Sequence, residues 1–308
     1  MVGLGKGPLS VLCIGIAVAV LLKSQHPGSP KNTPFEELRE GVFRHLNDFP
    51  LLPAPFLPVP TASWLIRGND QKSWILIDAG PSTPSYQKSL KAAVSSLLSG
   101  PDDEIKLILL THGHPDHVEG LPWLLEKYPK AQLAFHEKEA PFVTGGHQYK
   151  DLKGDTLIFE LGKHTQGVDS RQPQQRAVVL KGRHGDVAGS LTGFVTGAPA
   201  WLPQGFLEFL HTPGHSPGHL VFIHKPTQSV IAGDAFSYQS WGWPFFKTAV
   251  PRLNRPYPIA TVNSTAVQVS QKQIANLPGM VTAFASHDDA AGSSAAEMKA
   301  WTGSFPDA

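Results

Sequence analysis

Three histidines and one aspartate lie within six residues of one another in the first half of the chain, in the order His112, His114, Asp116 and His117. A neutral imidazole offers a nitrogen lone pair and a carboxylate offers a hard oxygen, a combination that suits zinc and, less exclusively, iron or manganese. Four such side chains cannot all face one point from a regular helix or strand, but they can do so from a tight loop. The segment therefore predicts a metal site.

The elements around this segment must place it at the end of a strand. The apolar run Lys106–Leu110 directly precedes the histidines and has the length of a strand. Further strands are expected at Ser63–Arg67, Ser73–Ile77, Phe206–Leu210, Leu220–His224 and Ser229–Ala232. Helices are expected at Phe35–Asn47, Pro84–Leu98, Glu119–Tyr128, Ser264–Asn276 and Ser293–Trp301.

The ligand segment resembles the motif of the metallo-β-lactamase superfamily, and four other motifs of that family occur in the expected order. They are the strand and turn Trp74–Gly80, the turn Thr212–Gly218 with Ser216 in place of threonine, the Gly-Asp element Ile231–Asp234, and the strand Ala283–His287. The resemblance runs from about Thr61 to about Trp301. It implies an α/β fold, an αββα four-layer sandwich, in the branch of hydroxyacylglutathione hydrolases and lactonases.

Carried over residue by residue, the resemblance assigns two zinc ions, with iron or manganese as alternatives. The first ion has the ligands His112, His114 and His215, the second has Asp116, His117 and His287, and Asp234 bridges both. Such a pair of ions holds a hydroxide between them and lowers its pKa. Asp116 and Tyr238 are assigned to catalysis, and Tyr238 would polarise the scissile carbonyl as in related lactonases. In those enzymes the tyrosine stands one position closer to the bridging aspartate.

The resemblance implies a hydrolase of esters, lactones or thioesters that acts on a small molecule. A β-lactam is a poor candidate substrate, because His117 and Asp234 keep the form found in the other hydrolases. An iron persulfide dioxygenase is the alternative, and it needs one metal, so that Asp116 and His287 would be dispensable. A glutathione thioester hydrolase is disfavoured because no clear basic cluster lies near the C-terminus. The complete ligand set argues against a non-catalytic binding protein.

Two segments are expected to influence the choice of substrate. Phe236–Phe246 has six aromatic residues among eleven and begins two positions after Asp234. We expect an apolar or aromatic substrate pocket there, with a hydrophobic plug or a membrane contact as alternatives. The glycine-rich stretch Gly145–Gly189 is either a surface insertion or a loop that folds over the metal site.

The remaining candidate residues have less specific roles. Asp78 is expected to orient the ligand loop from behind, as in the family. His211 and His219 are either core histidines or supports for a ligand. His136, His147, His164, His184 and His224 fit no ligand motif and are expected in loops or at the surface. Asp288 and Asp289 are expected in a solvated turn.

Composition agrees with the one compact catalytic domain that the resemblance implies. The chain has 308 residues, of which 41% are hydrophobic and 17% charged, enough for one large core. We assign residues 61–308 to this domain and residues 24–60 to a Pro-rich linker leading into it. The net charge of +1 and the absence of a basic stripe disfavour nucleic acid as a partner. The sequence leaves the oligomeric state open.

The N-terminus carries an apolar segment, Leu9–Leu22, between Lys6 and Lys23. Fourteen residues are short for a bilayer span but typical of a signal-peptide core. We expect residues 1–23 to be a cleaved signal peptide or an uncleaved signal-anchor, with a buried helix as the alternative. This interpretation favours the secretory pathway or membrane association over the cytoplasm.

Overall fold

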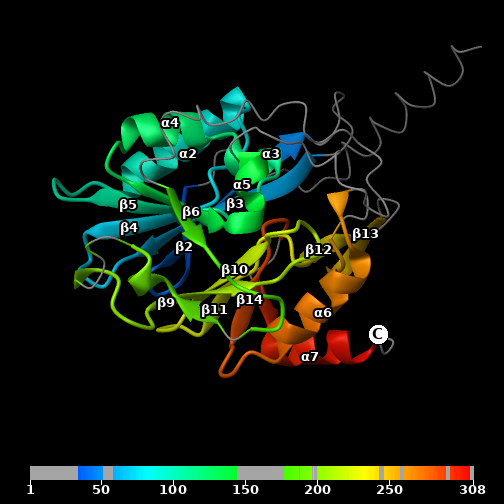
Figure 1. Ribbon diagram of the computed structural model, residues 1–308. Coiled ribbons are helices and arrows are strands. Elements are labelled where there is room, and N and C mark those ends of the chain that lie inside the picture. The colour runs from blue at the N-terminus through cyan, green and yellow to red at the C-terminus, as the bar shows by residue number, and fades with distance from the viewer. Residues whose placement is uncertain are drawn as a thin grey trace, which may run out of the picture.

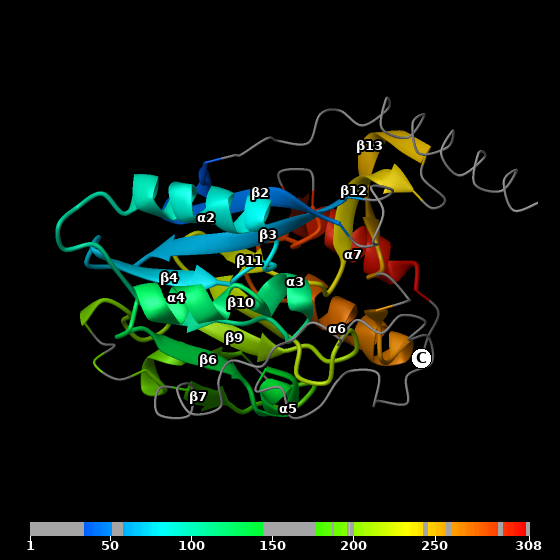
Figure 2. The ribbon, with the colours of Figure 1, turned by 90° about the horizontal axis from the view of Figure 1, so that it is seen from above.

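Two large β-sheets lie face to face, with helices on both outer faces, in the computed structural model of the chain (Figures 1 and 2). The structure describes residues 34–50, 58–143, 177–186, 188–195, 197, 200–242, 246–256, 260–288 and 292–305. The four layers, helix, sheet, sheet and helix, confirm the predicted αββα sandwich.

The first sheet has seven strands in the order of the sequence. They are β1 (Glu36–Arg39), β2 (Val42–Pro50), β3 (Pro58–Arg67), β4 (Ser73–Ile77), β5 (Glu104–Leu109), β6 (Gln132–His136) and β7 (Ala177–Leu180). β1 to β4 form an antiparallel meander, whereas β4 to β7 are parallel. The predicted hairpin of β3 and β4 is confirmed, with Arg67 paired to Trp74.

The second sheet has six strands in the order β15-β14-β11-β10-β9-β8. Their bounds are β8 (Gly189–Ser190), β9 (Leu207–His211), β10 (Leu220–His224), β11 (Ser229–Ile231), β14 (Thr282–Phe284) and β15 (Ser293–Ser294). β11 and β14 are parallel, and the other neighbours are antiparallel. A separate hairpin, β12 (Ser237–Gly242) and β13 (Phe246–Asn254), projects at one end of the sandwich (Figure 2).

Helices cover each sheet on the side that faces away from the other sheet (Figure 1). α2 (Pro84–Leu97) and α4 (Leu121–Lys127) pack on the first sheet, and α6 (Ser264–Ala275) and α7 (Ala295–Gly303) pack on the second. Short helical turns follow strand ends at α3 (Pro115–Val118), η1 (Glu137–Glu139), α5 (Ala140–Val143) and η4 (Leu191–Gly193). The predicted helices between Pro84 and Tyr128 and after Ser264 are therefore confirmed.

Three apolar layers hold the sandwich together, one between the sheets and one under each pair of helices. β4 shows how the sequence produces them. Its alternate residues Ile75 and Ile77 face the other sheet, whereas Trp74 and Leu76 lie under the helices. Because both faces of the strand are covered, all five of its residues are buried.

The expected helix at Phe35–Asn47 is wrong, because this stretch forms β1 and β2. The spacing of its apolar residues fits a helix, but Gly41 adopts φ of +73° in a turn between two strands. β2 then pairs with β3 from Val42 opposite Ile66 to Pro50 opposite Pro58. The long pairing with a buried strand outweighs the weak local preference for a helix.

The expectation of a membrane-anchored protein is also corrected. Among the residues that the structure describes, no helix has both the length and the apolar character needed to cross a bilayer. The segment Leu9–Leu22, on which this expectation and the assignment to the secretory pathway or membrane depended, lies outside the described residues.

Candidate metal centre

The predicted ligand loop leaves the carboxyl end of β5 and enters α3 within a few residues. His114 lies at the N-cap of α3, and Pro115 occupies its first turn, so that Asp116 and His117 lie on this single turn of helix. The strand end and the helical turn together direct four side chains of one short segment towards the same region. All four are buried.

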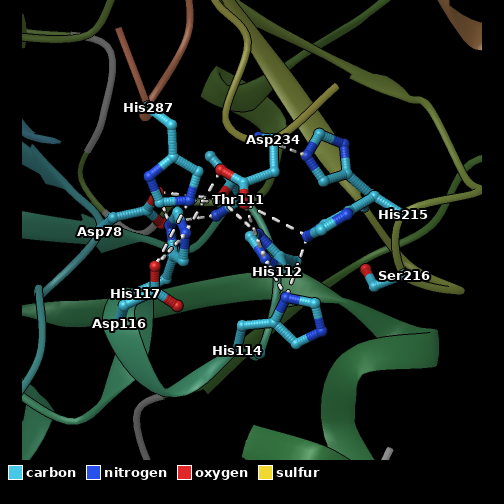
Figure 3. Close-up of polar contacts among 12 residues, drawn as sticks. Asp78, Thr111, His112, His114, Asp116, His117, His215, Ser216, Asp234 and His287 are labelled. Atoms are coloured by element: carbon cyan, nitrogen blue, oxygen red, sulfur yellow. Dashed lines mark hydrogen bonds and ion pairs between the residues drawn. The ribbon is translucent and has the colours of Figure 1, made fainter. Parts of the chain in front are cut away.

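Seven side chains converge in two groups at this edge of the sandwich (Figure 3). The first group is His112, His114, His215 and Asp234, and the second is Asp116, His117 and His287. The first sheet supplies the residues from 112 to 117. The second sheet supplies the other three, from the β9–β10 turn and from the ends of β11 and β14.

Distances within the first group are those of atoms that share one centre. His114 Nδ1 lies 2.8 Å from His112 Nε2 and 3.0 Å from His215 Nε2. Asp234 Oδ2 lies 3.2 Å from His215 Nε2 and 3.9 Å from His112 Nε2. His114 thus presents Nδ1 to the centre, whereas His112 and His215 present Nε2.

The second group has a similar geometry. Asp116 Oδ2 lies 3.5 Å from the Nε2 atoms of both His117 and His287. Asp234 reaches this group as well, because its Oδ1 is 3.4 Å from His117 Nε2 and its Oδ2 is 3.0 Å from His287 Nε2. One carboxylate therefore lies between the two groups.

These donor atoms fit metal ions. A tetrahedral zinc ion with bonds of about 2.0–2.1 Å separates its ligand atoms by about 3.3 Å, and the contacts above range from 2.8 to 3.9 Å. Among the atoms of the described residues, the buried His117 Nε2 and Asp234 Oδ1 have no hydrogen-bond partner. Buried polar atoms without a partner are costly, and an ion at each group would satisfy them.

Asp78 supports the centre from behind, as expected from the resemblance. Its Oδ1 accepts a hydrogen bond from Thr111 N at 2.8 Å, and its Oδ2 accepts from Thr111 Oγ1 and from His117 Nδ1, both at 2.8 Å. Thr111 Oγ1 in turn lies 3.0 Å from His112 Nδ1. With the protons of His112 and His117 on Nδ1, their Nε2 atoms keep lone pairs for an ion.

The histidines from the second sheet are oriented in the same way. His287 Nδ1 donates to the carbonyl oxygen of Pro60 at 2.7 Å, which fixes its lone pair on Nε2. His215 Nδ1 lies 3.3 Å from Thr261 Oγ1. Both outer partners hold the imidazole so that the other nitrogen faces the centre.

His219 proves to be a support for a candidate ligand, one of the two roles that the sequence left open. Its Nε2 accepts a hydrogen bond from the backbone N–H of Asp234 at 3.1 Å, and its Nδ1 lies 2.9 Å from Thr212 Oγ1. Burial lowers the pKa of His219 to about 3, so the ring is neutral and able to accept. Sequence spacing alone could not have distinguished this contact from ordinary core packing.

Glu139 has no counterpart in the sequence prediction, although it is fully buried beside the ligands. Its Oε2 accepts from Gly113 N at 2.9 Å, and its Oε1 accepts from Ser216 Oγ at 2.7 Å and Gly218 N at 2.6 Å. The only available signal was its position just after β6, whose carboxyl end lies at the same edge as that of β5.

Electrostatics differ between the two groups. Burial, with help from neighbouring imidazoles, lowers the pKa values of His112 and His114 well below the usual range, so both rings are neutral. Burial also disfavours the cation of His287, but Asp234 outweighs it and raises the pKa to about 8. Burial likewise disfavours the cation of His117, but Asp116 and Asp234 outweigh it and raise its pKa well above the usual value.

Asp234 is ionised. Burial alone would raise its pKa, but His287 and His117 hold it well below the ordinary value. The second group therefore attracts protons in the absence of a cation, and an ion that binds there displaces them.

The hydroxyl of Tyr238 does not point at either group in this conformation. It donates to Glu297 Oε1 in α7 at 2.9 Å. Its neighbour Phe236 is buried in the core under α6 and α7 and contacts the ring of Trp301. The side chain of Trp241 and residues 243–245 lie outside the described part of the chain, as does most of Gly145–Gly189.

Several other expectations about polar residues are wrong. His136 and His224 are buried, because both end strands that are covered on two sides. Asp288 is buried directly after His287 rather than solvated. His184 is exposed as expected, whereas His147, His164 and Asp289 lie outside the described residues.

The chain is similar in sequence to several curated proteins that are named as hydrolases. The chain is 29% identical over 180 residues to the probable metallo-hydrolase YybB of Bacillus subtilis, covering 58% of this chain and 64% of YybB. It is 28% identical to an atrochrysone carboxyl ACP thioesterase of Aspergillus fumigatus, over 52% of this chain and 26% of that protein. It is 27% identical to the hydroxyacylglutathione hydrolase GloC of Haemophilus influenzae, over 54% of this chain and 62% of GloC.

Solved structures share the fold. A metallo-β-lactamase from Hirschia baltica superposes with a TM-score of 0.56 over 88% of this chain and 98% of that one, at 16% sequence identity. The family model described as "Metallo-beta-lactamase superfamily" matches residues 57–287, which include all seven candidate ligands. The chain belongs to the metallo-β-lactamase superfamily.

Proposed function

We propose that the protein is a dinuclear metal-dependent hydrolase that cleaves an ester, lactone or thioester bond of a small molecule. The observation that carries the proposal is the position of the Asp234 carboxylate. Its Oδ2 lies 3.2 Å from His215 Nε2 of the first group, and its Oδ1 lies 3.4 Å from His117 Nε2 of the second. A carboxylate with two oxygens can bind one ion on each side.

Two divalent ions bound there would lower the pKa of a bound water towards neutrality and polarise the carbonyl under attack. The chain itself supplies a rigid set of donors. His112 and His114 are held neutral, with their lone pairs turned inward. Asp78 and His219 fix His117 and Asp234 from behind, and this keeps the ligand atoms in place before any ion arrives.

Tyr238 is proposed to donate a hydrogen bond to the substrate carbonyl. Burial and the neighbouring Glu297 raise its pKa to about 12, so the hydroxyl keeps its proton at neutral pH. The role requires that the hydroxyl exchange its present contact with Glu297 for the substrate. Asp116 is proposed to contribute as a ligand of the second ion at the reaction centre.

The mononuclear dioxygenase remains the competing proposal, and the second group argues against it. Asp116 and His287 would be dispensable in such an enzyme, yet both are buried and direct their donor atoms at each other, 3.5 Å apart. Metal analysis separates the two proposals, since a hydrolase should bind two zinc ions per chain and the dioxygenase one iron.

An acyl thioester is one substrate class that the relatives favour, because one of them is named an ACP thioesterase and another a hydroxyacylglutathione hydrolase. We further propose that the substrate carries an apolar or aromatic group, on the basis of the aromatic segment Phe236–Phe246. Phe236 itself belongs to the core. Replacing Trp241 with alanine should raise KM most for long or aromatic acyl groups, and an unchanged KM would refute the apolar pocket.

A substrate panel tests the proposed reaction. The zinc-loaded full chain should hydrolyse at least one member of a set of lactones, aryl esters and acyl thioesters, and should turn over a β-lactam poorly. Dominant turnover of the β-lactam would contradict the proposed substrate class.

A variant of the bridging carboxylate tests the metal assignment. Asp234→Asn removes the negative charge between the two groups, so turnover should fall at least about a hundredfold and metal content should drop. His215→Ala should behave similarly. The matched control His184→Ala changes an exposed histidine outside both groups and should retain activity. Full metal content and near-normal turnover in Asp234→Asn would exclude the two-ion arrangement.

A further inference from the structure

We propose that Glu139 is a positioning residue that joins the two loops carrying the ligands of the first ion, and that it determines the affinity for that ion. The inference rests on the proposed metal centre. It goes beyond it by assigning the organisation of the first group to a carboxylate that binds no metal itself.

Glu139 contacts the immediate neighbours of three of the four ligands in the first group. Gly113, which donates to Oε2, lies between His112 and His114 in the chain. Ser216, which donates to Oε1, directly follows His215. A single side chain therefore connects the loop after β5 to the turn between β9 and β10, and so connects the two sheets at the metal edge. Figure 3 shows Ser216 beside His215.

The chemistry of these contacts requires a carboxylate. Two backbone N–H groups and one hydroxyl all donate to Glu139, and an ionised carboxylate is the only side chain that offers acceptors on both arms. Hydrogen bonds to a buried charged acceptor are shorter and stronger than neutral ones. A glutamine would satisfy one arm but would direct its NH₂ group at an N–H donor on the other.

The turn that carries His215 is fitted closely to this carboxylate. A Cβ atom added at Gly218 would lie 2.8 Å from Glu139 Cγ and 2.9 Å from its backbone nitrogen. Pro217, between the two residues that bind Glu139, accepts a hydrogen bond from His211 Nε2 at 3.0 Å. Each of the three residues Ser216–Gly218 is thus fixed by a partner outside the turn.

The contacts of the second group are of another kind, because Asp78 and the Pro60 carbonyl hold the imidazoles of His117 and His287 directly. The inference therefore makes a selective prediction. Loss of the carboxylate should lower the affinity for the first ion and leave the affinity for the second largely unchanged.

The test measures metal affinity, not turnover. The full-length protein and its Glu139→Gln variant are stripped of metal and titrated with zinc in competition with a chromogenic chelator. They are also titrated with cobalt(II), whose visible absorption reports ligand geometry. We expect one of the two ions to bind about ten- to hundredfold more weakly in the variant, with an altered cobalt spectrum at that site. The other ion should retain the wild-type affinity.

Asp70→Asn is the matched control. Asp70 also accepts from two backbone N–H groups and one serine hydroxyl, those of Lys72 and Ser73, but it lies in the β3–β4 turn at the opposite end of the sheet. Its substitution should lower the melting temperature without changing either zinc affinity. A role of Glu139 in folding alone would produce this same pattern in Glu139→Gln, and that result would overturn the inference.

A second pair of variants decides the matter if Glu139→Gln does not fold. Ser216→Ala removes one donor to Glu139, whereas Ser216→Thr keeps the hydroxyl. The alanine variant should bind the first ion several-fold more weakly, and the threonine variant should match the wild type. Equal affinities in the two variants would refute the inference. A wild-type protein that binds no ion would refute the proposed function as well, so the two failures are distinguishable.

Discussion

Replacing Asp78 with asparagine should weaken the binding of the second ion, and the structure indicates by how much. The substitution is isosteric, and asparagine tolerates the left-handed backbone at this position, where φ is +60°. The carboxylate accepts three hydrogen bonds of 2.8 Å, two from Thr111 and one from His117 Nδ1. An amide oxygen can replace only one of the two carboxylate arms.

Both orientations of the new amide are unfavourable. If its oxygen accepts from His117, its NH₂ group faces the N–H of Thr111. If the oxygen accepts from Thr111 N, the NH₂ group faces His117 Nδ1 and favours the tautomer whose proton lies on Nε2, the ligand atom. A hydrogen bond to a charged group contributes about 1.5–3 kcal/mol. At about 1.4 kcal/mol per factor of ten, the affinity for the second ion should fall about ten- to hundredfold.

Competition with a chelator, followed by metal analysis of the protein, measures this loss. Asp70→Asn again serves as the control, because its contacts lie far from the centre. Wild-type affinity for both ions in Asp78→Asn, with the fold intact, would refute the argument that the outer hydrogen bond sets the tautomer of His117.

Two further predictions concern residues outside the ligand set. Tyr238→Phe should lower kcat with little change in KM if the hydroxyl polarises the carbonyl, whereas Glu297→Gln should leave kcat intact. A lower melting temperature with unchanged kcat in Tyr238→Phe would instead mean that the hydroxyl only joins β12 to α7. His224, far from the ligands, is kept neutral by burial, which lowers its pKa from 6.5 to about 4. Because the unfolded state binds this proton more readily, the contribution of His224 to the free energy of unfolding is fully present above pH 6.5 and declines as pH falls towards 4. The metal-free His224→Gln variant should therefore lose about 2 kcal/mol less free energy of unfolding than the wild type between pH 7.5 and pH 5, as measured by urea unfolding. Equal losses in the two proteins would show that His224 is not neutral in the fold.

The sequence revealed the candidate ligands because they occur in short motifs. Four lie in one short segment. His215 and Asp234 each directly follow a glycine within a recognisable motif. The strands around them were also predictable, since their apolar runs are continuous and bounded by turns.

Long-range placement could not be predicted in the same way. Glu139 reaches Ser216 only because the ends of β6 and β9 meet across two sheets, and no local pattern encodes that meeting. The stretch 35–47 fits a helix by spacing alone, and its pairing with β3 decided otherwise. His136 and His224 were expected in loops or at the surface because they fit no ligand motif. Both are buried, since the burial of a polar residue at a strand end depends on distant segments that cover it.

The division of the ligands between the two sheets has a consequence for the folding of the chain. Asp116 and His117 come from the first sheet and His287 from the second, 170 positions further along than His117. A shared ion would thus act as a reversible cross-link between the halves of the sandwich, in a sequence whose single cysteine allows no internal disulfide. Ligand linkage adds about 2.7 kcal/mol to the free energy of unfolding when free metal exceeds Kd a hundredfold. The concentration of free metal would then determine how stably the two sheets pack together, as well as whether the centre can react. Amide hydrogen exchange at the strand ends should slow as each ion binds.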